Sequence, residues 1–108
     1  MKKKWAKDLT SGRKLANFSL TEPQSGSDAA TMYSRARIGK DGTWTINGSK
    51  AWVSLAGEAD IYLTVVKTSD TPGHKDMAMI AIPKGTKGLS FGPLYDTASY
   101  NFLPLGEM

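Results

Sequence analysis

The sequence contains no cysteine and a single histidine, His74. Without cysteine the chain has no disulfide bonds and no thiolate metal ligands, and one histidine by itself does not make a zinc site. No apolar run approaches the ~20 residues of a membrane-spanning helix, and the basic residues 2–4 are not followed by the apolar core of a signal peptide. We therefore expect an intracellular, soluble protein that needs no oxidising compartment and has no membrane partner.

A large excess of one charge is also missing. Fourteen Lys and Arg against ten Asp and Glu give a net charge of +4, a modest excess that favours anionic partners in general. The one dense basic run, Lys2–Lys4, lies at the end of the chain, where a solvated terminus is the ordinary expectation. Nucleic acid is therefore not the partner that we expect.

The length of 108 residues, with 40% apolar content, suits one domain with a single core. At its start, Trp5 and Leu9 lie on one face of a helix, and Gly12 suits the C-terminal cap. This pattern predicts a helix over residues 2–11. Isolated helices shorter than about 12–15 residues are marginal in water, so we expect this one to pack on the domain or to end a longer helix.

After Gly12 the sequence changes to short apolar or alternating runs separated by turn residues, which predicts an all-β domain. Asp41-Gly42 supplies the turn of a hairpin, and Asn47-Gly48 marks a second turn or bulge. The expected strands cover residues 15–21, 33–38, 43–46, 49–55, 61–68, 77–82 and 89–91, with a last strand beginning in 101–108.

The first candidate site is the run from Phe18 to Asp28, which leads from a strand into a loop with Gly26 between two serines. A glycine lets the backbone approach a ligand closely, and successive N–H groups beside serine hydroxyls can cradle a phosphate oxygen. The same Ser-Gly-Ser-Asp run also suits a plain turn or a helix cap. Local chemistry leaves both interpretations open.

The second candidate site is the strand expected over residues 49–55. Its alternation places Trp52 and Ser54 on one face and Val53 on the other. An indole beside a hydroxyl could stack on a planar ring and hydrogen-bond the edge of that ring. The alternative is a tryptophan that belongs to the core.

The remaining titratable residues carry less chemistry. His74 lies in a loop, where it could meet an anionic group, although single surface histidines are commonly inert. None of the carboxylates near the candidate sites is convincing as a general base. These carboxylates are Glu22, Asp28, Glu58 and Asp60.

Five segments follow one another along the chain: Leu20-Thr-Glu-Pro-Gln-Ser-Gly-Ser-Asp28, Ile46-Asn-Gly-Ser-Lys-Ala-Trp-Val-Ser54, Gly57-Glu-Ala-Asp-Ile61, Gly73-His-Lys75 and Lys84-Gly-Thr-Lys-Gly-Leu-Ser-Phe91. Taken in this order, they resemble the middle domain of the acyl-CoA dehydrogenase family. Their order and spacing are far more specific than any single segment.

The resemblance implies an all-β fold, either a small antiparallel β barrel or two packed orthogonal sheets, with a short N-terminal helical stub. Residues 1–14 would be the end of a preceding helix, and residues 15–108 would be the middle domain, truncated before its last strand. Helical domains of the parent chain would flank it, and the domain would bind one side of FAD. The implied FAD contacts are Phe18, Leu20 and Thr21 along the flavin ring, Gly26 and Ser27 near the pyrophosphate, and Trp52, Val53 and Ser54 at the other edge of the ring.

The implied substrate is acyl-CoA, with Ser27 and His74 at positions that touch its CoA portion. The implied reaction removes an α proton and transfers the β hydrogen as a hydride to flavin N5, and an electron-transfer flavoprotein then takes the electrons. The family's catalytic carboxylate lies outside this domain, so we expect no catalytic residue here and no activity from this chain alone. The resemblance further implies a homo-oligomeric parent in the cytoplasm or, in a eukaryote, the mitochondrial matrix.

Two other hypotheses stay open. The chain could be a dehydrogenase-like remnant that serves as a scaffold or binds acyl-CoA without catalysis. It could also be a stand-alone β module that holds single-stranded nucleic acid through Trp44, Trp52 and its basic residues, in which case binding would be sensitive to salt.

Overall fold

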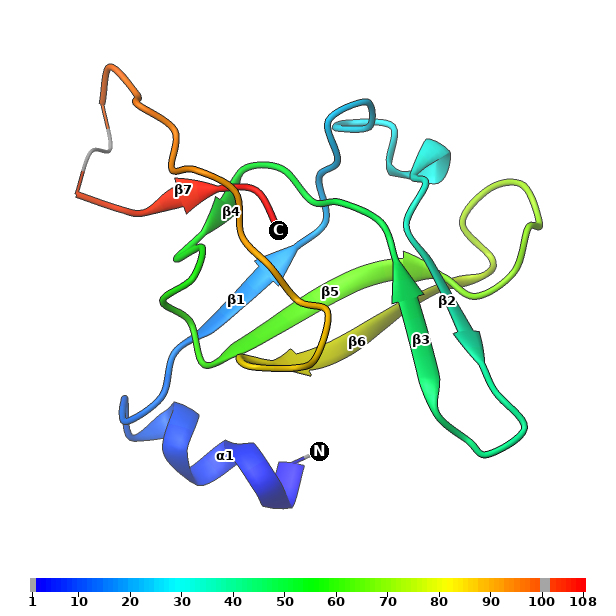
Figure 1. Cartoon of the computed structure of the whole chain (residues 1–108), viewed down its shortest axis with the longest axis horizontal. Helices are drawn as coiled ribbons and strands as arrows, with labels where there is room; N and C mark the ends of the chain where they lie inside the picture. The colour runs from blue at the N-terminus through cyan, green and yellow to red at the C-terminus, as the bar shows by residue number, and fades with distance from the viewer. Residues whose placement is uncertain (1, 100–101) are drawn as a thin grey trace.

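The computed structural model describes residues 2–99 and 102–108 and shows a mostly β chain (Figure 1). The helix α1 spans Lys2–Thr10, and a single 3₁₀ turn, η1, spans Ala29–Thr31. Gly12 ends α1 with a φ of +71°, and its N–H donates to the carbonyl of Leu9 at 3.2 Å. The predicted N-terminal helix is therefore confirmed, while Met1 lies outside the described residues.

The main sheet has five strands arranged around β5 (Ile61–Lys67) (Figure 1). β6 (Met77–Pro83) lies antiparallel along one edge of β5, and β1 (Ala16–Ser19) lies parallel along the first part of the other edge. β2 (Arg35–Ile38) continues that second edge, and β3 (Trp44–Asn47) adds an outer antiparallel strand. β5 suits the central place because it is rich in β-branched and aromatic residues, which pack well with neighbours on both sides.

The hairpin predicted at Asp41-Gly42 is confirmed. β2 and β3 pair antiparallel along their whole length. Gly42 has a φ of +79°, which a glycine adopts without strain, and the N–H of Gly39 donates to the carbonyl of Thr43 at 2.8 Å. The turn residues alone were enough to place this hairpin.

The strand expected over residues 49–55 is much shorter in the structure. Only β4 (Val53–Ser54) forms a ladder, and it pairs with β7 (Leu105–Gly106) in a separate two-stranded sheet. Trp52 and Leu55 flank β4 with φ values of +57° and +56°. These values lie in the left-handed region, where a regular strand does not continue.

Two further strand predictions differ from the structure. Residues 89–91 form no strand. Phe91 packs against the core instead, since the centroid of its ring lies 5.0 Å from that of the Tyr62 ring. Of the strand expected to begin in 101–108, the structure shows only β7, and Asn101 lies outside the described residues.

The predicted all-β class with a short N-terminal helix is confirmed, but its antiparallel arrangement is wrong. β1 and β2 both run parallel to β5, so the main sheet is mixed. Within the described residues the strands form two sheets and do not close into a barrel. The direction of a partner strand depends on the long segment that joins the two strands, so alternation within each strand could not predict it.

The core fixes β4 on the rest of the chain. The hydroxyl of buried Tyr62 donates to the carbonyl of Leu55 at 3.1 Å, directly after β4. Burial of apolar side chains supplies most of the stability of such a cluster. Its buried members are Val53, Ala56, Ala59, Tyr62 and Ile82.

Candidate functional site

The first predicted segment lies on β1, where alternate side chains face opposite ways. Asn17 and Ser19 are buried, whereas Phe18 between them is 58% exposed. Leu20 and Thr21, which follow β1, are half-buried. An outward-facing phenyl ring on a fixed strand is available to contact a ligand.

The second predicted segment presents an exposed indole. Trp52 is 60% exposed, so the alternative that it belongs to the core is wrong. Its φ of +57° is unusual for a bulky residue and costs roughly 1–3 kcal/mol, which the surrounding structure must sustain. Its ring lies beside Tyr95, with centroids 4.6 Å apart. Val53 is fully buried, backbone included, so it presents no accessible surface within the described chain, and Ser54 is half-buried.

Two long-range hydrogen bonds join these segments. The N–H of Ala51 donates to the carbonyl of Thr21 at 2.9 Å, and the side-chain amide of Asn17 donates to the carbonyl of Ser54 at 2.7 Å. Figure 1 accordingly shows β4 beside the end of β1. These two segments, far apart in the sequence, are therefore held next to each other. We call residues 18–21 and 52–54, taken together, the wall.

A buried ion pair lies behind the wall. Lys50 Nζ and Glu22 Oε1 are 2.8 Å apart, and the two side chains are only 2% and 1% exposed. Glu22 also accepts the backbone N–H groups of Tyr33 at 2.5 Å and Ser34 at 2.9 Å. Burial by itself would raise the pKa of Glu22, but the hydrogen bonds from Lys50, Ser34 and Tyr33 outweigh it and lower the pKa to about 2. Glu22 is therefore ionised at neutral pH.

This ion pair was not predictable from sequence patterns. Glu22 precedes a proline in a loop, and Lys50 follows a turn, and both are ordinary places for exposed charges. The one available signal is that Lys50 stands directly before the apolar residues of a segment expected to be a strand. A charged residue at such a place needs a partner if the segment is buried.

The loop after the first wall segment turns tightly. Glu22 and Ser25 exchange backbone hydrogen bonds at 2.9 and 3.1 Å, and the Ser25 hydroxyl donates to the carbonyl of Asp28 at 2.8 Å. Gly26 and Ser27 are exposed, and neither N–H finds an acceptor within residues 2–99 and 102–108. A Cβ added at Gly26 would meet no atom within 4 Å, so packing inside the chain does not require this glycine. Both N–H groups are available to an anionic ligand.

His74 lies in the loop between β5 and β6. Its imidazole is exposed, and Nδ1 is 3.4 Å from the sulfur of Met77. Asp70 of the same loop is held by Arg37 of β2 at 2.8 Å. In the part of the chain that the structure describes, no hydrogen bond or ion pair joins His74 to the wall or to Ser27. Its assignment to CoA stays a prediction.

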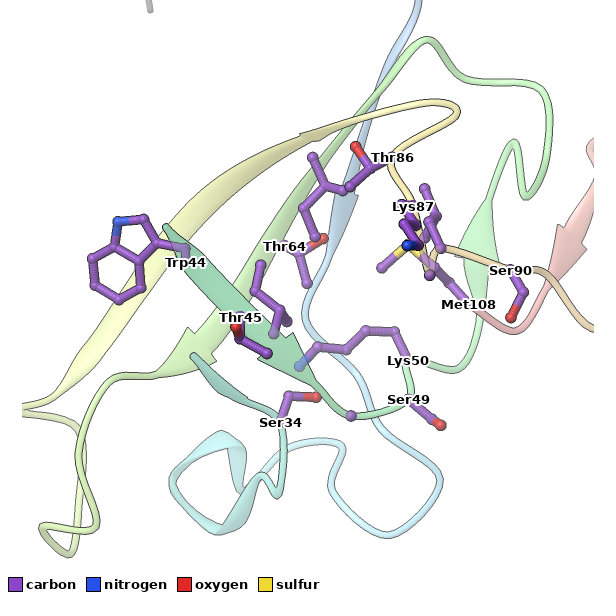
Figure 2. Close-up of a pocket in the computed structure, with 15 residues that line it drawn as sticks. Ser34, Trp44, Thr45, Ser49, Lys50, Thr64, Thr86, Lys87, Ser90 and Met108 are labelled. Atoms are coloured by element: carbon purple, nitrogen blue, oxygen red, sulfur yellow. The ribbon is translucent and has the colours of Figure 1, made fainter. Parts of the chain in front are cut away.

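A cavity of about 370 Å³ lies elsewhere on the chain (Figure 2). It is lined by β3 and the residues that follow it, by the segment 86–90 and by Met108. None of the predicted FAD contacts lines it. Lys50 lines it too, and Figure 2 shows its side chain reaching toward Ser34. The cavity therefore borders the support of the wall and is not the predicted site.

Other kinds of site find no support among the described residues. No group of three or more His, Asp or Glu side chains there is placed to hold a metal ion. No helix there has the length and apolar character that crossing a membrane requires. The wall, with its exposed rings on tethered backbone, is the best candidate surface for a ligand.

Known proteins resemble this chain over most of its length. Residues 17–108 match the family model described as acyl-CoA dehydrogenase, middle domain. The chain is 39% identical over 104 residues to the mitochondrial isobutyryl-CoA dehydrogenase of Dictyostelium discoideum. This match covers 95% of this chain and 24% of that relative.

Two solved structures share the fold. Butyryl-CoA dehydrogenase from Megasphaera elsdenii superposes with a TM-score of 0.94 at 34% identity, over 98% of this chain and 28% of that one. An acyl-CoA dehydrogenase from Bacillus anthracis, complexed with FAD, has a TM-score of 0.88 at 31% identity, over 98% of this chain and 18% of that one. The chain thus spans between 18% and 28% of the length of these relatives. Because the match covers residues 17–108, nearly the whole chain, this protein belongs to the acyl-CoA dehydrogenase family and corresponds to its middle domain.

Proposed function

We propose that the wall binds one side of FAD in an acyl-CoA dehydrogenase. The observation that carries this proposal is the presence of two exposed aromatic side chains, Phe18 and Trp52, on segments that long-range hydrogen bonds hold together. We assign residues 1–14 to a helix that precedes the middle domain and residues 15–108 to the middle domain itself. Helical domains of the parent enzyme would complete the site.

The described residues fit such a cofactor. The exposed indole and phenyl rings offer flat apolar surface to an isoalloxazine ring, and Ser54 offers a hydroxyl to its edge. The N–H groups of Gly26 and Ser27, which find no acceptor in the described chain, suit the charge of a pyrophosphate. The other contacts that we assign to the ring are those of Leu20, Thr21 and Val53.

The reaction that we propose for the parent enzyme is the α,β-dehydrogenation of an acyl-CoA thioester. Bound FAD would accept the β hydrogen as a hydride while the α proton is removed, which leaves a 2-enoyl-CoA. This chain's residues would bind and orient. We assign the CoA portion to Ser27 and His74. Ser27 lies two residues before η1, the element that precedes β2 in the chain, and His74 lies in the β5–β6 loop, whose Asp70 is held by Arg37 of β2.

The catalytic base would come from outside this chain. Glu22, the carboxylate next to the wall, is buried against Lys50 and has a pKa of about 2. A general base works best with a pKa near the working pH, so Glu22 is poorly suited to remove a proton. We therefore expect this chain alone to be inactive.

The proposal extends to the partners and compartment that the family implies. The substrate would be acyl-CoA, and an electron-transfer flavoprotein would take the electrons from the reduced flavin. The parent would be a homo-oligomer in the cytoplasm or the mitochondrial matrix, which agrees with a relative named as mitochondrial. Nucleic acid and membranes are not part of the proposal.

Titration with FAD, followed by tryptophan fluorescence, tests the proposal. Trp52→Phe is compared with Trp44→Phe, because Trp44 is also exposed but lies on β3, outside the wall. We expect weak binding or none, with any Kd above about 1 μM, because one wall is only part of a site. Quenching by FAD should be lost in Trp52→Phe and kept in Trp44→Phe.

Two outcomes would count against this. Quenching that persists unchanged in Trp52→Phe would contradict the assignment of the wall to the flavin. Sub-micromolar affinity of the chain alone would contradict the expectation that other domains complete the site.

A further inference from the structure

We propose that Glu22 and Lys50 are a positioning pair for FAD, which holds the two segments of the wall in the arrangement that contacts the flavin. This inference rests on the proposed function. It adds two residues that would act on the flavin indirectly, by positioning the residues that contact it. Both side chains are almost completely buried, so neither would touch the cofactor itself.

Lys50 and Ala51 hold two consecutive carbonyl groups of the wall. Lys50 Nζ donates to the carbonyl of Leu20 at 3.0 Å, and the Ala51 N–H donates to the carbonyl of Thr21 at 2.9 Å. Trp52 follows directly in the chain. One short stretch therefore sets the position of the first wall segment and also the start of the second.

Glu22 fixes the other side of the same arrangement. Its Oε1 accepts from Lys50 Nζ at 2.8 Å and from the Ser34 N–H at 2.9 Å. Its Oε2 accepts from the Tyr33 N–H at 2.5 Å and from the Gln24 side chain at 2.7 Å. Donors from three parts of the chain thus converge on one carboxylate. Because Glu22 directly follows the first wall segment, a displacement of this carboxylate would move the wall with it.

Stability alone is a poor reason for such a pair. Two apolar side chains of similar volume often serve a fold as well as a buried ion pair does. Apolar side chains, however, have no donor for the Leu20 carbonyl and no acceptor for the N–H groups of Tyr33 and Ser34. What the charged pair adds is therefore a fixed position for the backbone beside the wall.

The chain contains a matched pair for comparison. Lys67 and Asp76 are also buried, at 5% and 8% exposure, with Nζ and Oδ1 3.8 Å apart. They lie at the start and end of the β5–β6 loop, and among the described residues neither side chain is hydrogen-bonded to the wall, to Glu22 or to Lys50, although the Lys67 backbone N–H donates to the carbonyl of Ser34 at 3.0 Å. Replacement of their side chains removes a buried ion pair but none of the side-chain hydrogen bonds of Glu22 and Lys50.

The test compares two double variants of the chain. Glu22→Gln/Lys50→Met removes the positioning pair, and Asp76→Asn/Lys67→Met removes the matched pair. Each takes away both charges, so neither leaves a buried charge without its partner. The first readout is the NMR chemical shift of the backbone and indole N–H groups, which needs no ligand, and the second is the affinity for FAD.

Removal of the positioning pair should displace the N–H signals of Thr21 and Trp52 in a folded chain and weaken FAD binding about tenfold. The matched variant should leave both signals in place and keep the affinity within about twofold. Equal displacement by both variants would overturn the inference. Unmoved Thr21 and Trp52 signals in Glu22→Gln/Lys50→Met would overturn it as well.

The two readouts separate this inference from the proposed function. If the unmodified chain binds no FAD at all, the chemical shifts alone decide whether the pair positions the wall. If FAD binds equally well with and without the pair, the inference fails and the proposed function stands. Should Glu22→Gln/Lys50→Met not fold, Glu22→Gln/Lys50→Gln keeps polar groups at both positions and is judged by the same criteria.

Discussion

The wall and the β5–β6 loop both face solvent and both carry predicted ligand contacts, yet they are held in different ways. The wall depends on hydrogen bonds between distant segments, such as that from Asn17 to Ser54. The β5–β6 loop is held inside by its own residues, since Asp76 accepts from the backbone N–H of Ser69 at 3.3 Å and from its hydroxyl at 2.9 Å. Its ties to β2 are ion pairs of the exposed Asp70 with Arg35 and Arg37. A surface tied together across the chain can keep the fixed geometry that a cofactor site requires.

The buried ion pair beside the wall is shorter and more completely hydrogen-bonded than the one in the β5–β6 loop. Glu22 and Lys50 are 2.8 Å apart, and both oxygens of Glu22 accept hydrogen bonds. Lys67 and Asp76 are 3.8 Å apart, and among the described residues Oδ1 of Asp76 has no hydrogen-bond donor. The ion pair in which both carboxylate oxygens accept hydrogen bonds is therefore the one beside the wall, where the exposed aromatic side chains lie.

The largest loss of stability should come from replacing one residue of a buried ion pair. Glu22→Gln leaves Lys50 as a buried cation without its partner, so we expect the free energy of unfolding to fall by about 3–5 kcal/mol. Asp76→Asn should cost clearly less, because its ion pair is longer and less completely hydrogen-bonded. Urea unfolding at neutral pH measures both variants. Equal losses would remove the distinction between the two regions.

Acid should reveal the same pair. The pKa of Glu22 falls from an ordinary value of 4.5 to about 2 in the folded chain. Its contribution to stability is therefore complete above pH 4.5 and is lost as the pH falls to about 2, a change on the order of 3 kcal/mol. Urea unfolding of the chain and of Glu22→Gln across this range measures the contribution.

Part of the acid response should survive in Glu22→Gln. Hydrogen bonds from Arg37 and Arg35 also lower the pKa of Asp70, so the variant keeps some loss of stability in acid. The difference between the two pH profiles is what belongs to Glu22. If the free energies of unfolding of the chain and of Glu22→Gln change with pH in the same way, ionised Glu22 does not stabilise the fold as its hydrogen bonds and burial indicate.

The smallest effects should come from two positions with positive φ. Trp52→Gly relieves the strain at a φ of +57°, and we expect the gain to offset much of the lost ring contact with Tyr95, for a net change within about 1 kcal/mol. Gly73→Ala in the loop introduces strain at a φ of +89° without any clash, and should cost about 1–2 kcal/mol. Thermal unfolding compares them. A large loss in Trp52→Gly would show that the indole serves the fold more than a ligand.

Several local features followed directly from neighbouring residues. Asp41-Gly42 predicted the hairpin, Gly12 predicted the end of α1, and the alternation along β1 is what turns Phe18 outward. Each of these depends on backbone geometry over two to five residues. Their prediction required no knowledge of the rest of the chain.

Features that depend on distant segments were not predictable in the same way. The strand expected over residues 49–55 is interrupted by the left-handed conformation of Trp52 and Leu55. The expected antiparallel pairing is wrong for β1, which runs parallel to β5. Both outcomes are set by what each segment packs against. Alternation along a strand reports which side chains share a face and carries no information on the partner or its direction.

By itself, the sequence determined the β class, the turns and the ordered motifs that identify the family, because each depends on residues that are close along the chain. Only the tertiary structure decided that Phe18 and Trp52 are both exposed on segments held side by side and that Glu22 and Lys50 meet next to these segments. Burial and long-range hydrogen bonds cause both, and these exist only once distant segments come together.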